Sequence, residues 1–135
     1  MTHTYIGAQV LGHPDQHMTI MFLGALDRDR IEHIKNIMTF ISEQGNGPTT
    51  WIAERGHIDM LGPRKTVPSI IVKPCNCIRR YLTVLASNGI ESTSRWPWNP
   101  HIALKMKKDE DFVIPSTYRF SSVYLSVGKE RTHFH

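Results

Sequence analysis

The feature that most constrains the fold is a pair of short segments, residues 17–24 and 99–106, that each contain a histidine followed by an alternating, strand-like run. In a β-strand, side chains two positions apart share one face. The first segment therefore places His17 and Thr19 on the same face of a strand. The opposite face of that strand is apolar and is predicted to point into the core: Met18, Ile20 and Phe22.

The second segment repeats this pattern. His101 heads the run, and Ala103 and Lys105 share the face of the histidine. The alternate positions are again apolar: Ile102, Leu104 and Met106. The chain is therefore expected to present two histidines in matching strand settings that are far apart in the sequence.

Length and composition set further bounds. At 135 residues the chain is predicted to form one domain, residues 1–135, with a hydrophobic core of its own. It contains neither an apolar run long enough to span a membrane nor the basic-then-apolar start of a signal peptide, so a cytoplasmic protein with no membrane partner is expected. The net charge of +4 suits an anionic ligand such as a nucleotide or RNA.

The rest of the chain predicts an α+β protein with antiparallel strand pairing. A helix over residues 28–43, starting after Asp27, is predicted by apolar residues at helical spacing: Ile31, Ile34, Met38 and Ile41. A second helix is expected to have Pro74 in its first turn and to bury Ile78, Leu82 and Leu85. Strands are predicted at residues 5–11, 17–23, 49–61 (one bent strand or two), 69–72, 101–106 and 118–127, with a possible extension of the sheet within 128–135.

The two histidine segments resemble the signature motifs of the 2H phosphoesterase superfamily, which includes the 2′-5′ RNA ligase-like proteins. The motif of that family is His, an apolar residue, Thr or Ser, and another apolar residue, and it occurs twice. Residues 17–20 fit it fully, and residues 101–104 fit except at Ala103. The resemblance implies a bilobal fold with pseudo-twofold symmetry, in which antiparallel sheets line a central cleft and the helices lie outside.

The resemblance also implies an activity. Members of this family cleave or transfer phosphodiesters next to a ribose hydroxyl without a metal or another cofactor. The implied substrate is a small nucleotide or an RNA end: a 2′,3′-cyclic phosphate, a 2′-5′ linkage or a cyclic oligonucleotide second messenger. Small bacteriophage members resemble this chain in size and cleave cyclic oligonucleotide signals, which makes an anti-defence enzyme the narrower expectation.

This chemistry explains why the residue types matter. Histidine serves as general base and general acid because its ordinary pKa lies near 6.5, so His17 and His101 are the expected acid/base pair, with either one as the base. The Thr19 hydroxyl is the expected donor to the phosphate. The second motif lacks the matching hydroxyl at Ala103. Lys105 is expected to compensate, or else a residue from elsewhere: Tyr5, Arg95 or Tyr124.

Selectivity is expected from the rim of the cleft. Trp96 and Trp98 precede the second motif, and one of them is predicted to stack on a base of the substrate. Tyr5 on the first strand is a further candidate for ligand contact. Glu130 follows the last long strand, a region where the resemblance places an acidic ligand contact in members that degrade cyclic oligonucleotides.

Two alternatives stay open. The loss of the hydroxyl at Ala103 is compatible with a nucleotide-binding or RNA-binding protein that does not turn its ligand over. The other alternative is an α+β domain in which the two histidine strands resemble the family motif by chance. A metal site is not expected, because Cys75 and Cys77 are one residue apart and the histidines have no acidic partner at ligand spacing. The sequence indicates no obligate protein partner and leaves the oligomeric state open.

Overall fold

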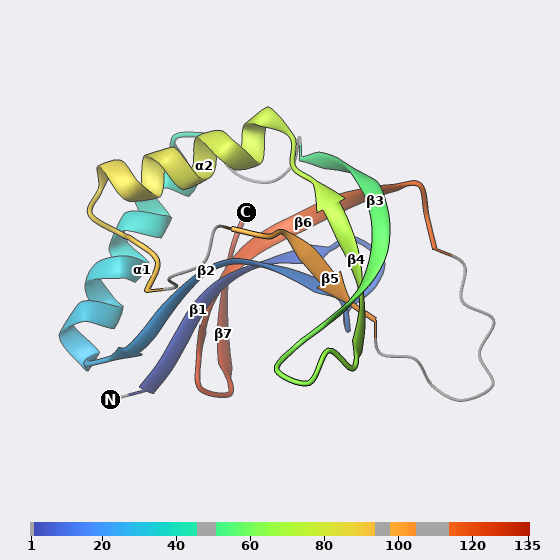
Figure 1. Ribbon diagram of the computed structural model, residues 1–135. Helices are drawn as coiled ribbons and strands as arrows, with labels where there is room; N and C mark the ends of the chain where they lie inside the picture. Colours follow the sequence, from blue (N-terminus) through green and yellow to red (C-terminus); the bar gives the residue numbers. More distant parts are fainter. Residues whose placement is uncertain (1, 46–50, 94–97, 105–113) are drawn as a thin grey trace.

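The computed structural model describes residues 2–45, 51–93, 98–104 and 114–135, and in this part of the chain seven strands and two helices form one α+β unit (Figure 1). The strands are β1 (Thr2–Val10), β2 (His17–Leu26), β3 (Ile52–Leu61), β4 (Val67–Lys73), β5 (His101–Ala103), β6 (Thr117–Val127) and β7 (Glu130–Phe134). The helices are α1 (Arg28–Glu43) and α2 (Asn76–Ser87). The predicted α+β class with antiparallel pairing is confirmed.

The seven strands form one sheet that consists of two groups, which we call wings. The two wings are paired with each other at two places. The first wing has the order β2-β1-β6-β7, and the second has the order β5-β4-β3. One seam joins β2 to β5, where Met18 lies opposite Ile102. The other joins β3 to the start of β6, where Ala53 lies opposite Tyr118. Each wing therefore contributes one histidine strand, β2 or β5, to the first seam.

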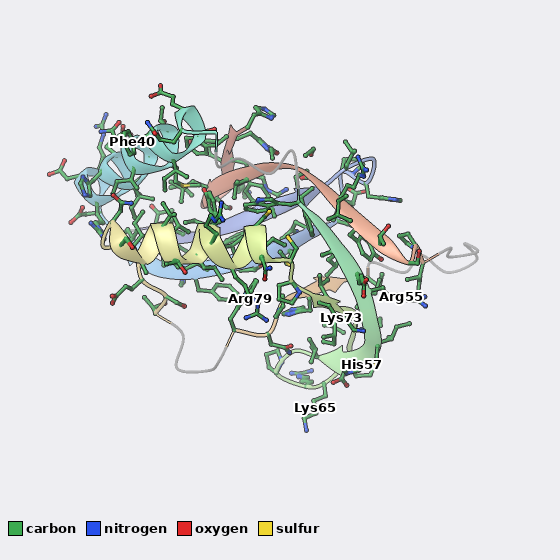
Figure 2. All side chains as sticks on the ribbon, turned by 90° about the horizontal axis from the view of Figure 1, so that it is seen from above. Phe40, Arg55, His57, Lys65, Lys73 and Arg79 are labelled. Carbon is green, nitrogen blue, oxygen red and sulfur yellow. The ribbon has the colours of Figure 1, made fainter. Side chains whose placement is uncertain are left out.

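Both helices cover the same side of the sheet, as the two views show (Figures 1 and 2). Each helix packs an apolar stripe against the strands: Ile31, Ile34, Met38 and Ile41 from α1, and Ile78, Tyr81 and Leu85 from α2. The strands meet them with residues that are completely buried: Ile6, Ala8, Met18, Ile70 and Ile102. Because strand residues alternate between faces, the other side of the sheet is left for polar side chains. We call that side the polar face.

Three local expectations are corrected. The alternation predicts Phe22 in the core, but Phe22 is 54% exposed, because a bulge between the pairs Ile6–Met21 and Gly7–Thr19 reverses the alternation of β2. Pro74 precedes α2 rather than lying in its first turn, since Cys75 is the N-cap. Tyr81 is buried in α2, whereas the predicted Leu82 is only partly buried. Neither described helix is long and apolar enough to cross a membrane.

Helix α1 spans the predicted residues 28–43 and is capped as expected. The Asp27 carboxylate accepts a hydrogen bond from the Arg30 backbone N–H at 2.8 Å. Replacing Asp27 by alanine is expected to lower the free energy of unfolding by about 0.5–2 kcal/mol, because a backbone donor loses its partner. Chemical denaturation of Asp27→Ala beside Asp29→Ala, a first-turn carboxylate that is not the cap, measures this. An equal loss of unfolding free energy in both variants would mean that the effect comes from the removed negative charge and not from the capping hydrogen bond.

Candidate active site

The seam between β2 and β5 brings the two predicted motifs side by side. Met18 and Ile102 lie opposite each other there, and both are completely buried on the helix side. Residues that flank a buried strand residue point to the opposite face. The flanking side chains therefore all lie on the polar face, and all are half-buried: His17, Thr19, His101 and Ala103. In this antiparallel register, Thr19 is the neighbour of His101, and Ala103 is the neighbour of His17.

His17 is positioned by the turn that precedes it. Gln9 of β1 lies opposite His17. The Gln9 side-chain amide donates to the carbonyls of His13 and Gln16, each at 2.9 Å, and the Val10 N–H donates to Gln16 as well. Gln9 thus holds the turn between β1 and β2 with its own side chain and fixes where the histidine enters the strand.

The strand of His101 is held from both sides. On the β4 side, the backbone N–H groups of Val72 and Leu104 donate to the carbonyls of Pro100 and Pro68 at 3.0 and 2.9 Å. On the β2 side, the Trp98 indole Nε1 donates to the Thr19 carbonyl at 3.2 Å. These bonds fix β5 against both neighbours although the strand itself is short.

A main-chain bond sets the tautomer of His101. Its Nδ1 lies 2.7 Å from the carbonyl oxygen of Asn99. A carbonyl oxygen only accepts hydrogen bonds, so Nδ1 is the donor and carries the hydrogen. In the neutral ring, Nε2 then carries the lone pair, which is the form that can accept a proton.

Gly7 lets a tyrosine of β6 reach the histidine. Gly7 lies between Thr19 on β2 and Tyr124 on β6, and a Cβ at Gly7 would lie 2.6 Å from both Cζ and Oη of Tyr124. The Tyr124 ring therefore lies across the backbone of β1. Its centroid is 6.1 Å from that of His17 and 5.9 Å from that of Tyr5, and the two tyrosine hydroxyls are 3.4 Å apart. Tyr5 also contacts His17, at 5.8 Å between ring centroids.

The Tyr124 hydroxyl remains protonated. Burial raises its pKa well above the usual range, and the hydrogen bond to Tyr5 acts in the same direction, whereas the Arg131 guanidinium lowers it only in part. A phenol held in this form is a hydrogen-bond donor. The Tyr5–Tyr124 pair thus packs against His17 from the β1 side, away from Ala103, and the half-buried Tyr5 is its accessible member.

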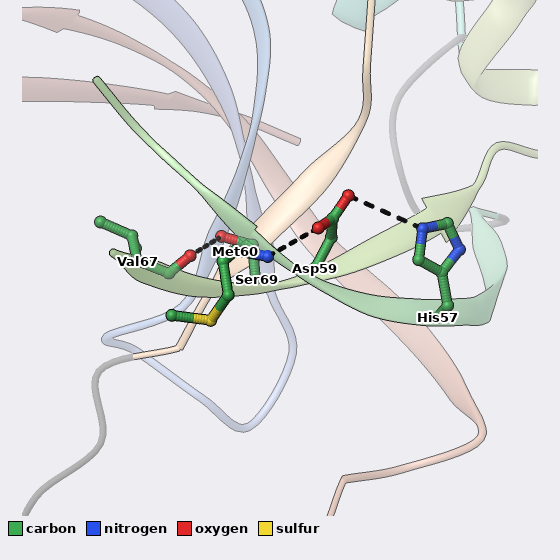
Figure 3. Close-up of polar contacts among 5 residues, drawn as sticks. All are labelled: His57, Asp59, Met60, Val67 and Ser69. Carbon is green, nitrogen blue, oxygen red and sulfur yellow. Dashed lines mark hydrogen bonds and ion pairs between the residues drawn. The ribbon is translucent and has the colours of Figure 1, made fainter. Parts of the chain in front are cut away.

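The hydroxyl opposite Ala103 does not replace the missing one. Ser69 of β4 lies opposite Ala103, is completely buried, and donates to the Val67 carbonyl at 3.2 Å (Figure 3). The same figure shows Asp59 of β3 accepting from the Met60 N–H at 2.8 Å and facing His57 at 3.9 Å. The Ser69 and Asp59 side chains therefore bond within the β3–β4 hairpin.

Strand β7 extends the polar face beyond Tyr124. His133 lies opposite Tyr124, Arg131 lies opposite Ser126, and the Arg131 guanidinium carbon is 4.7 Å from the Tyr124 ring centroid. The His133 Nδ1 shares a hydrogen bond of 2.8 Å with the Ser122 hydroxyl. Burial lowers the pKa of His133, and the charges of His135 and Arg131 lower it further, which favours the neutral ring.

The other predicted site residues are placed as follows. Tyr5 lies on the polar face with the histidines. Trp98 packs against the core and bonds to the main chain of β2. Glu130 is exposed, and alternation along β7 places it on the face opposite Arg131 and His133. Lys105, Trp96 and Arg95 lie outside the described residues.

Sequence reasoning missed Gly7, Gln9, Arg131 and the place of His133, and named Tyr124 only as one alternative donor. Two signals pointed to them. A glycine inside a strand often marks a close approach of another group, as at Gly7. The alternation of Arg131, His133 and His135 indicated a shared face of the last strand. Gln9 offered no signal, because a glutamine in a strand is ordinarily a surface residue.

The second wing and α2 also carry exposed basic side chains. The labelled residues Arg55, Lys65, Lys73 and Arg79 belong to the second wing and α2, far from Phe40 on α1 (Figure 2). Arg79 projects from a helix that covers the other side of the sheet. Within the described ranges, no three His, Cys, Asp or Glu side chains come together as metal ligands.

Solved structures of known proteins share this fold. E. coli LigT in complex with 3′-AMP aligns with a TM-score of 0.61 and 14% identity over 99% of this chain and 95% of LigT. A phosphoesterase aligns with a TM-score of 0.60 and 13% identity over 99% of both chains, and TT0787 of Thermus thermophilus with 0.59 and 10% over 98% and 97%. No protein-family model and no curated protein matches the sequence. The chain therefore has, over nearly its whole length, the fold of LigT and of the solved phosphoesterase.

Proposed function

We propose that this protein is a metal-independent phosphodiesterase that acts on ribonucleotide phosphodiester bonds through a pair of histidines. The observation that carries the proposal is the seam register, which sets His17, Thr19 and His101 on one face with Met18 and Ile102 buried behind them. Two imidazoles and a hydroxyl in this arrangement are the groups that phosphodiester cleavage needs: a base, an acid and a donor to the phosphate.

The tautomer of His101 supports its role as the base. With Nδ1 bonded to the Asn99 carbonyl, Nε2 accepts the proton of the attacking ribose hydroxyl or water. His17 then donates a proton to the leaving oxygen. As negative charge develops on the non-bridging oxygens, the Thr19 hydroxyl donates to them from its place beside His101. The half-buried Tyr5 hydroxyl, which is hydrogen-bonded to Tyr124, takes the place of the donor that Ala103 lacks.

The ligands of the structural neighbours support the substrate class. E. coli LigT has been solved with 3′-AMP and with phosphate, so a protein of this fold binds a nucleotide with phosphate on the ribose. The proposed substrates are a 2′,3′-cyclic phosphate, a 2′-5′ linkage and a cyclic oligonucleotide. In its finer form, the proposal is the cleavage of a cyclic oligonucleotide signal in the cytoplasm as an anti-defence activity.

A cleavage assay in excess EDTA tests the proposal. The panel contains 2′,3′-cyclic nucleotides, 2′-5′-linked diadenylate, and cyclic di- and trinucleotides. We expect at least one of them to be cleaved at an unchanged rate after chelation. Nucleotide binding without cleavage of any panel member would favour the alternative function, a binding protein with an impaired second motif.

Restoring the motif hydroxyl distinguishes these two functions. If the tyrosines compensate, Ala103→Thr is expected to change kcat/KM by less than about tenfold, whereas a site disabled by the missing donor would gain about 10²-fold or more. Ala103→Val is the control, because valine has the shape of threonine without its hydroxyl. Steady-state kinetics on the best panel substrate measure both. A large gain in the threonine variant alone would contradict compensation.

A further inference from the structure

The polar face continues past the two histidines to a cationic group on β7. The Tyr124 ring is in contact with His17 on one side, at 6.1 Å between centroids, and with His133 on the other, at 5.3 Å. The Arg131 guanidinium carbon lies over the same ring at 4.7 Å. One aromatic ring therefore separates the guanidinium from the histidine of the first motif.

Arg131 has no carboxylate partner within the described ranges. The ion pairs there join Lys35 to Glu32 and His57 to Asp59. Glu130, its neighbour in sequence, lies on the opposite face of β7. A guanidinium that stacks on an aromatic ring keeps its N–H groups at the edge of its plane, where they can bind both oxygens of a phosphate.

His133 adds a second nitrogen to this group. Its Nδ1 is bonded to the Ser122 hydroxyl, which fixes the ring next to Tyr124. Its Nε2 has no hydrogen-bond partner among the residues that the structure describes. A nearby phosphate would offset the neighbouring positive charges that disfavour protonation of this ring.

We propose that Arg131, assisted by His133, binds a second phosphate of the substrate, one nucleotide away from the bond that is cleaved. The inference rests on the proposed function, because it takes the scissile phosphate to lie between His17 and His101. It narrows the substrate class to nucleotides with at least two phosphates, such as a linear or cyclic oligonucleotide, and disfavours a simple 2′,3′-cyclic mononucleotide. The buried Tyr124 ring, in contact with His17 and beneath the Arg131 guanidinium, sets the spacing between the two phosphate positions.

Binding experiments test this subsite without requiring turnover. Isothermal titration calorimetry would compare adenosine 3′,5′-bisphosphate with adenosine 3′-monophosphate on the wild type, Arg131→Gln and His133→Gln. Lys129→Gln is the matched control, since it removes one exposed positive charge from the turn before the same strand. All variants are first compared by circular dichroism and thermal unfolding, and Arg131→Lys serves as the conservative variant.

The wild type is expected to bind the bisphosphate at least about tenfold more tightly than the monophosphate. Arg131→Gln should lose most of this preference while binding the monophosphate within about twofold of the wild type, and Lys129→Gln should keep it. If the subsite requires an arginine, Arg131→Lys should keep only part of the preference for the bisphosphate, because lysine cannot bind a phosphate bidentately. Equal affinity of the wild type for both ligands, or an unchanged preference in Arg131→Gln, would overturn the proposal.

The same experiments separate failure of the subsite from failure of the proposed function. A bisphosphate preference that depends on Arg131, in a protein that cleaves no member of the substrate panel, would establish the subsite and reject the enzyme. Cleavage that requires both histidines, without any preference for the second phosphate, would establish the enzyme and reject the subsite.

Discussion

Replacing His101 by alanine is expected to lower kcat/KM for phosphodiester cleavage by about 10²–10⁴-fold, which is the range that general acid–base catalysis supplies. His17→Ala is expected to have a loss in the same range. Because the two imidazoles act in one proton-transfer sequence, the double variant should be only slightly slower than either single variant. Initial rates on the best substrate of the panel measure all three.

The matched control is His33→Ala. His33 is an exposed histidine on α1, on the side of the sheet away from the polar face. Its replacement should leave kcat/KM unchanged. The assignment of the acid/base pair would be contradicted if either His17→Ala or His101→Ala kept near wild-type activity with an intact fold.

Gly7→Ala is expected to have the second-largest effect, on both stability and activity. The new methyl group would meet the Tyr124 ring at 2.6 Å, closer than carbon atoms pack, so the buried ring must move. We expect the free energy of unfolding to fall by about 1–3 kcal/mol. We also expect kcat/KM to fall by about 10²-fold, because a shift of about 1 Å misplaces the hydroxyls beside His17.

A double-mutant cycle identifies the cause. Tyr124→Ala removes the atoms that the methyl group would strike, so adding Gly7→Ala in that background should have little further effect on stability. Urea denaturation of the four proteins gives the coupling free energy between the two positions. Additive losses would mean that Gly7 is required for its own backbone conformation rather than for the passage of the tyrosine.

Local patterns in the sequence were enough to predict helix α1 and the two strands that carry the motifs. The spacing of Ile31, Ile34 and Met38 predicted α1, because a 3.6-residue period leaves one face of a helix for the core. The alternation around His17 and His101 predicted which side chains share a face, and the seam register agrees with it.

Long-range pairing was beyond those patterns. The antiparallel pairing of β1 with β6 brings Tyr124 beside Gly7, and nothing within either strand specifies that partner. The bulge in β2 was also missed, because it changes the register by one residue and exposes Phe22, and the bulged residues of β2 themselves include no glycine or proline. Arg131 enters the site only because β7 pairs with β6 in the register that follows from their turn.

The pH dependence of kcat/KM in excess EDTA tests the central claim most directly. A histidine base must be unprotonated and a histidine acid must be protonated, so the rate should fall on both sides of an optimum. We expect a bell-shaped profile, and no loss of activity in the chelator. The base sets the acidic limb of the profile, and the acid sets the alkaline limb. A profile with a single limb, or activity that chelation abolishes and a divalent metal restores, would contradict cleavage by two histidines without a metal.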